Sequence, residues 1–144
     1  MMRGYDFIWR LARPLLPLML AWRARSGKED AARLTERFGR YDHRDNLPDD
    51  PLWIHAVSVG ETVAGIALAE AIRKTGETAP ILMTTNTVTA AARVAALPAS
   101  LGVTHLYQPL DHPDMVAAFL HRIRPRIGLF LESDFWPTLI TATA

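Results

Sequence analysis

The chain has 144 residues, a length that corresponds to about one domain with a single hydrophobic core. Hydrophobic residues make up 49% and charged residues 22% of the sequence, with a formal net charge of +1; these ordinary globular values exclude wholesale disorder. There is no cysteine, which excludes a disulfide framework and a thiolate metal site and is typical of a cytosolic protein.

Residues 5–25 are apolar but interrupted by arginines and prolines. Their longest uncharged run, residues 14–22, is well short of the roughly 20 residues that a membrane-spanning helix needs, and no signal-peptide cleavage site follows it. Trp9 and Trp22 stand among leucines and arginines, a pattern typical of a helix at the membrane interface beside anionic headgroups. The alternative is a helix packed on the domain, with arginine stems covering apolar surface.

The composition indicates a second helix over residues 26–39, which ends at Gly39. Residues 40–51 are polar and contain two prolines, so we interpret them as a linker. Residues 1–44 hold ten Arg or Lys against five Asp or Glu, which favours contact with an anionic partner. We therefore divide the chain into a basic, helical arm (1–44) and a body (45–144).

The body alternates short apolar runs with segments of helical periodicity. The predicted strands cover residues 52–54, 81–84, 103–107 and 126–131. The predicted helices cover residues 62–74, 88–97 and 114–123, and another begins near residue 135. This alternation predicts an α/β fold, a Rossmann-like parallel sheet with helices on both faces. The sequence stops inside a helix that has barely begun, so we expect a piece of a larger architecture.

Polar residues follow each predicted strand, and the carboxyl ends of parallel strands share one edge of the sheet, where such folds bind ligands. These residues are Ser58, Glu61, Thr84, Thr85, Asn86, Gln108, Asp111, Glu132 and Asp134. Glu61 and the pair Glu132 and Asp134 are suited to general-base chemistry on a hydroxyl group. We expect Gly60 to adopt backbone angles that turn Glu61 toward the crevice. Alternatively, Glu61 only complements a helix dipole, and Asp134 only caps a helix.

Other chemistries find little support in the sequence. Ser58 lacks the surroundings of a nucleophile elbow, and His55 lies within a predicted strand as a core residue. The remaining histidines have no metal-ligand spacing, so no metal site is expected. Trp136 is interpreted as a core residue. The sequence has no phosphate-binding glycine signature, and its body lacks interleaved basic and aromatic residues, which argues against nucleic acid.

Three motifs stand in the order and spacing of the Kdo (3-deoxy-D-manno-octulosonic acid) transferase family. They are Glu36-Arg37-Phe38-Gly39-Arg40-Tyr41, Trp53-Ile54-His55-Ala56-Val57-Ser58-Val59-Gly60-Glu61 and Glu132-Ser133-Asp134-Phe135-Trp136-Pro137. The turns at residues 84–89 and 107–111 also resemble that family, so the resemblance covers nearly the whole chain. It departs from the usual family pattern at Ser133 and Asp134, where Thr and Glu are usual, and at Asn86, where Met is usual.

The resemblance implies a GT-B fold, in which two Rossmann-like domains enclose the active site and this chain is the acceptor-side domain. It implies transfer of Kdo from CMP-Kdo to a glucosamine hydroxyl of the lipid A precursor, with inversion and without a metal or cofactor. The implied location is the cytoplasmic face of the bacterial inner membrane, where residues 1–25 would contact lipid. Since the donor-binding domain is absent, the chain alone is expected to be inactive.

The resemblance further implies that Glu61 is the general base and Glu132 a second essential carboxylate. Acceptor contacts are then expected from the neighbouring turns, at Ser58, Gly60, Thr84, Thr85 and Asp134. Two alternatives remain open: another GT-B glycosyltransferase that uses a nucleotide sugar, or a non-catalytic module that docks on anionic lipid.

Overall fold

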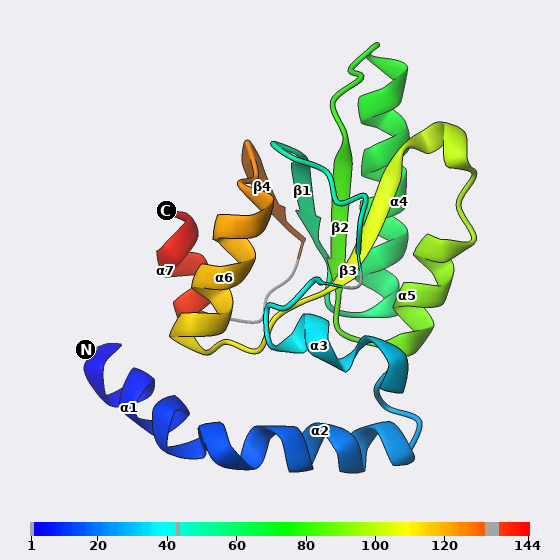
Figure 1. The fold of residues 1–144 in the computed structure, drawn as a ribbon. Helices are drawn as coiled ribbons and strands as arrows, with labels where there is room; N and C mark the ends of the chain where they lie inside the picture. Colours follow the sequence, from blue (N-terminus) through cyan, green and yellow to red (C-terminus); the bar gives the residue numbers. More distant parts are fainter. Residues whose placement is uncertain (1, 43, 132–135) are drawn as a thin grey trace.

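Four parallel strands form the centre of the fold in the computed structural model, which describes residues 2–42, 44–131 and 136–144 (Figure 1). The strands are β1 (Leu52–His55), β2 (Ile81–Thr85), β3 (Val103–Tyr107) and β4 (Ile127–Phe130). Their order across the sheet is β3-β2-β1-β4, and all neighbouring pairs are parallel. The predicted α/β class is therefore confirmed, and each predicted strand is present within two residues of its expected ends.

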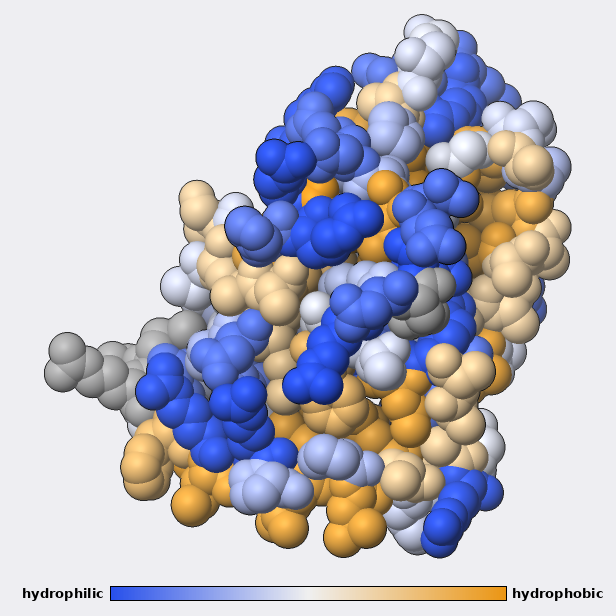
Figure 2. Space-filling view, viewed as in Figure 1, coloured by the Kyte–Doolittle hydropathy of each residue, from blue (hydrophilic) through white to orange (hydrophobic). Residues whose placement is uncertain are grey.

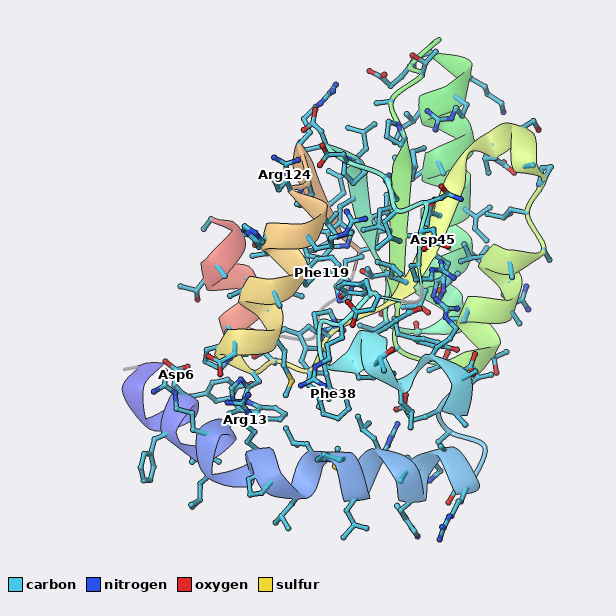
Figure 3. The ribbon with its side chains drawn as sticks, viewed as in Figure 1. Asp6, Arg13, Phe38, Asp45, Phe119 and Arg124 are labelled. Carbon is cyan, nitrogen blue, oxygen red and sulfur yellow. The ribbon has the colours of Figure 1, made fainter. Side chains whose placement is uncertain are left out.

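Helices cover both faces of the sheet, as the near-continuous apolar strands require. On one face lie α4 (Val59–Lys74) and α5 (Val88–Ala95), and on the other α6 (Pro113–Ile123) and α7 (Pro137–Thr143); η3 (Ala99–Leu101) precedes β3. Neighbouring strand residues alternate between two cores. Trp53 packs toward α6 against Phe119, whose ring lies between that helix and the sheet in Figure 3, whereas Ile54 packs toward α4 and α5.

Strands β1 and β2 are each followed by a helix whose first turn is capped by a side chain. Ser58 precedes α4 and its hydroxyl accepts a hydrogen bond from the Glu61 N–H, while Thr87 does the same for the Ala90 N–H of α5. Such caps satisfy backbone donors that have no partner within the helix. These capped turns follow β1 and β2 directly and form the carboxyl edge of the sheet.

The first part of the arm consists of α1 (Met2–Ala12), η1 (Arg13–Leu15) and α2 (Leu16–Arg25), and Figure 1 shows this part running past the carboxyl edge of the sheet. Pro14 and Pro17 lie in the first turns of η1 and α2, where a missing N–H costs little, so the chain changes helix type there instead of forming one long rod. Within the described residues, no helix combines the length and apolarity needed to cross a bilayer.

The helix predicted over residues 26–39 is wrong in its extent. This segment forms a turn, the short η2 (Ala31–Arg33) and the four-residue α3 (Leu34–Arg37), because several of its charged side chains turn inward to the sheet. Its predicted end at Gly39 is confirmed: φ is +70°, and a Cβ there would lie 2.6 Å from the Met115 carbonyl oxygen. Tyr41 then enters the core beside Phe119, and the division at residue 44 stays a prediction.

A candidate active site at the carboxyl edge of the sheet

Glu61 lies in the first turn of α4, half-buried, and forms a reciprocal capping box with Ser58. Its Oε2 atom accepts hydrogen bonds from the backbone N–H groups of Val57 (2.8 Å) and Ser58 (3.0 Å). Glu61 is thus an acidic residue at the N-terminus of α4 that complements the helix dipole, as the alternative interpretation predicted. Among the described residues, the hydrogen bonds to the Glu61 carboxylate are on Oε2, so this oxygen orients the side chain.

The prediction for Gly60 is wrong in its mechanism. Gly60 lies within α4 and is not among the glycines with positive φ, and the nearest atom to a Cβ built there is Ser58 Oγ at 4.0 Å. The backbone therefore needs no glycine at this position. The orientation of Glu61 instead comes from the capping box, which is a local hydrogen-bonding device.

Arg37, at the end of α3, joins the loops of the carboxyl edge. Its Nη1 donates to Asn86 Oδ1 (2.7 Å) and to the Gln108 carbonyl (3.0 Å), and its Nη2 donates to the Asn86 carbonyl (2.6 Å). The Asn86 N–H in turn donates to the Val57 carbonyl at 3.4 Å. A continuous chain of hydrogen bonds therefore runs from Arg37 through the loop after β2 to the residue that holds Glu61.

Two buried acids accompany Arg37. Glu29 accepts from Arg37 Nε (2.9 Å) on one oxygen and from Arg23 Nε of α2 (3.0 Å) on the other, so it links α2 to α3. Glu36, fully buried, accepts from the Tyr107 N–H (2.8 Å) and pairs in bidentate fashion with Arg33. This network was not predicted from the sequence, although Glu36 and Arg37 open the first family motif. The one available signal was the presence of charged residues just before Gly39, where the predicted helix ends.

Thr84 and Thr85, which were expected to contact an acceptor, are fully buried. Thr84 Oγ1 accepts from Trp53 Nε1 (2.8 Å) and contacts His55 Nδ1 (2.7 Å), while Thr85 Oγ1 contacts His105 Nε2 (2.9 Å). Both hydroxyls make these contacts inside the core. They could contact an acceptor substrate, as predicted, only if this packing opened. The expectation that His55 is a core residue is confirmed.

Asp111 also follows a strand, but its contacts are structural. Its carboxylate accepts from the N–H groups of Thr138 (3.1 Å) and Leu139 (2.8 Å) at the start of α7 and from the Tyr5 hydroxyl of α1 (2.7 Å). The partnership with Asp111 and burial together raise the pKa of Tyr5 to about 12, burial being the larger cause. Asp111 therefore caps one helix and anchors another.

Glu132 and Asp134 lie outside the described residues. The chain enters that segment from Leu131, whose N–H donates to the His55 carbonyl at the end of β1 (3.0 Å), and it emerges at Trp136. Trp136 packs against the core on the α6 face, as expected. In the described part of the chain, no cluster of three His, Asp or Glu side chains has the arrangement of a metal site.

His105 gives a pH-dependent prediction. Burial, aided by Arg33 and Arg44, lowers the pKa of His105 to about 3. Because the unfolded chain protonates this side chain near pH 6.5, it binds more protons than the folded chain below that pH, and stability falls with pH toward 3. Between pH 6 and pH 4, the free energy of unfolding should fall by about 2 kcal/mol more in the parent than in His105→Gln.

Urea titrations of both proteins at each pH measure this difference. Comparing the two slopes removes the contribution of carboxylates that titrate in the same range. Parallel slopes for the parent and His105→Gln would contradict the assigned neutral state of the histidine.

The family model described as 3-deoxy-D-manno-octulosonic-acid transferase (kdotransferase) matches residues 32–144, which include the capping box and Arg37. The chain belongs to the Kdo transferase family. It is 37% identical to the 3-deoxy-D-manno-octulosonic acid transferase of Bordetella pertussis over 90% of this chain and 32% of that protein.

Two further relatives give the same picture. The transferase of Rickettsia bellii is 34% identical over 100% of this chain and 34% of that protein. A probable mitochondrial 3-deoxy-D-manno-octulosonic acid transferase of Arabidopsis thaliana is 35% identical over 96% of this chain and 32% of that protein. The chain thus spans about a third of the length of the curated relatives it matches.

Proposed function

We propose that the Kdo transferase to which this chain contributes moves Kdo from CMP-Kdo to a glucosamine hydroxyl of the lipid A precursor. The chain would serve as the acceptor-side half of a GT-B enzyme, on the cytoplasmic face of the bacterial inner membrane. The family match across residues 32–144 is the observation that carries this proposal. The oriented carboxylate at the edge where α/β folds bind ligands supports it.

In this mechanism Glu61 removes the proton from the acceptor hydroxyl while that oxygen attacks the anomeric carbon of Kdo. The bond from this carbon to the phosphate oxygen of CMP breaks, CMP departs with the bonding electrons, and the configuration inverts. The two N–H groups on Oε2 hold the Glu61 carboxylate in this orientation. Glu132 remains the proposed second carboxylate, with Ser58, Gly60 and Asp134 as proposed acceptor contacts.

Donor selection tests the proposal against another nucleotide-sugar glycosyltransferase. A protein that spans the full length of the relatives would be incubated with lipid A precursor and either CMP-Kdo or a UDP-sugar, and the product identified by mass spectrometry. We expect transfer from CMP-Kdo alone. Transfer from a UDP-sugar with none from CMP-Kdo would overturn the assignment.

The exposed side of the arm favours membrane contact as part of this function. Its large hydrophobic side chains recur every three or four residues and are 63 to 73% exposed: Phe7, Ile8, Leu11, Leu15, Leu18 and Trp22. Figure 2 shows such residues along the side of the arm that faces away from the sheet. We call these six residues the apolar stripe. Arg10 and Arg25 are exposed on the same helices and suit anionic headgroups.

The double variant Leu15→Ser/Leu18→Ser should bind anionic liposomes at least tenfold more weakly than the parent chain. Burial of one leucine is worth about 1.5–3 kcal/mol, and about 1.4 kcal/mol corresponds to a factor of ten. Co-sedimentation with vesicles measures the partition coefficient. Val63→Ser, half-exposed on α4, is the matched control and should bind normally. Equal binding by the double variant and the parent would exclude the apolar stripe as the contact.

A further inference from the structure

The capping box fixes the Glu61 carboxylate only relative to the loop after β1. Both N–H groups on Glu61 Oε2 belong to this loop, at Val57 and Ser58. If the loop shifts, the carboxylate shifts with it. A general base must lie within hydrogen-bond reach of the proton that it removes, so the loop itself needs support from another part of the molecule.

The backbone of Asn86, in the loop after β2, provides a contact of this kind. The Asn86 N–H donates to the Val57 carbonyl at 3.4 Å, just beyond the bond from the Ala56 N–H to the Thr84 carbonyl (3.0 Å). A separation of 3.4 Å is long for a hydrogen bond between backbone groups. Such a contact orders Val57 only if Asn86 is itself held in place.

Arg37 binds Asn86 at two points, one on its side chain and one on its backbone. Nη1 donates to Asn86 Oδ1 at 2.7 Å, and Nη2 donates to the Asn86 carbonyl at 2.6 Å. Short hydrogen bonds from a charged donor are the strong kind, and the planar guanidinium fixes the directions of both. The position of Asn86 therefore follows that of Arg37.

The guanidinium of Arg37 has little freedom to move. The residue is only 5% exposed, and its Nε donates to Glu29 at 2.9 Å while Nη1 also donates to the Gln108 carbonyl at 3.0 Å. The Arg37 Cζ atom lies over the Tyr107 ring, 5.1 Å from its centre. Helix α3, which ends at Arg37, lies against the carboxyl edge of the sheet (Figure 1). Arg37 is thus held by residues outside the loops after β1 and β2.

We propose that Asn86 is a positioning residue for Glu61. Its side chain binds Arg37, its N–H orders Val57, and the Val57 N–H in turn orients the Glu61 carboxylate. The inference deepens the proposed function, on which it rests, since it concerns the geometry of the base. Misplacing a reacting group by about 1 Å costs on the order of 100-fold in rate, so partial loss of this support should cost about tenfold.

Asn86→Leu in the full-length transferase tests the inference, because leucine has a similar size and offers no acceptor to Arg37 Nη1. We expect kcat for Kdo transfer to fall about tenfold, with the KM for CMP-Kdo unchanged within about twofold. Asn86→Asp keeps an oxygen for Nη1 and should restore kcat to within about threefold of the parent. Thr89→Leu, an exposed change of the same kind on α5, is the matched control and should turn over normally.

The same change in the Glu61→Gln background separates positioning from a general structural defect. A residue that acts only through the base should matter little once the base is gone, so Glu61→Gln/Asn86→Leu should retain the residual rate of Glu61→Gln within about twofold. A further loss of about tenfold in that background, an unchanged kcat in Asn86→Leu, or no recovery in Asn86→Asp would each overturn the inference. Asn86→Ala takes the place of Asn86→Leu if thermal unfolding shows that the latter does not fold.

Failure of the inference can be told apart from failure of the proposed function. Near-normal turnover by Glu61→Gln would refute the proposed base and, with it, the positioning of that base by Asn86. Loss of transfer in Glu61→Gln, together with losses that multiply in the double variant, would refute the inference alone.

Discussion

Replacing Glu61 by glutamine in the full-length transferase should reduce the rate of Kdo transfer by at least about 100-fold, because a general base contributes about 10² to 10⁴ in rate. Glutamine retains an oxygen that accepts from the Val57 and Ser58 N–H groups, and it is a normal residue in a capping box. Stability should therefore change by less than about 1 kcal/mol. Steady-state kinetics with CMP-Kdo, together with thermal unfolding, separate the two effects.

Glu61→Ala extends this test, since it removes both the base and the cap. It should lose transfer to the same degree and in addition lose about 1–2 kcal/mol of stability. Glu70→Gln, an exposed acid on the same helix, is the matched control and should retain full activity. Near-normal turnover by Glu61→Gln would refute the catalytic role and leave Glu61 as a cap alone.

Replacing Arg37 by methionine should destabilise the chain by about 3–5 kcal/mol, the cost of removing one partner of a buried ion pair. The variant leaves Glu29 charged and buried, with only Arg23 as a partner, and leaves the carbonyls of Asn86 and Gln108 without this donor. Urea-induced unfolding measures the change in free energy.

Two further variants make this measurement specific. Arg93→Met, exposed on α5, should change stability by less than about 0.5 kcal/mol. The double variant Arg37→Met/Glu29→Met should be more stable than the sum of the single changes predicts, since no buried charge is then left unpaired. A loss below about 1 kcal/mol for Arg37→Met would contradict the central position of this arginine in the network.

Much of the body is predictable from its sequence because local signals and tertiary structure agree there. Apolar runs such as the one around Ile54 are short and bounded by turn residues, and the Ser58 and Thr87 hydroxyls cap the helices that follow. A parallel sheet with short connections leaves few other arrangements for these elements. The position of Glu61 at the carboxyl edge follows from the same reasoning.

The interior of the candidate site is not predictable in this way. A hydroxyl-rich turn has the same local pattern whether its side chains face solvent or, as Thr84 and Thr85 do, the core. The charges of Glu29, Glu36 and Arg37 favour a solvent-exposed helix by propensity, but partners more than 60 residues away turn Glu36 and Arg37 inward. Such pairing depends on tertiary neighbours that periodicity does not identify.

Titration of the ¹⁵N-labelled chain with the deacylated glucosamine disaccharide of the lipid A precursor most directly tests whether the carboxyl edge binds the acceptor. The account predicts that backbone amide signals shift at this edge, with the largest changes at Val57, Ser58, Glu61 and Asn86. Shifts confined to the opposite end of the sheet, around the exposed Asp49–Arg124 and Asp50–Arg126 pairs, would contradict it.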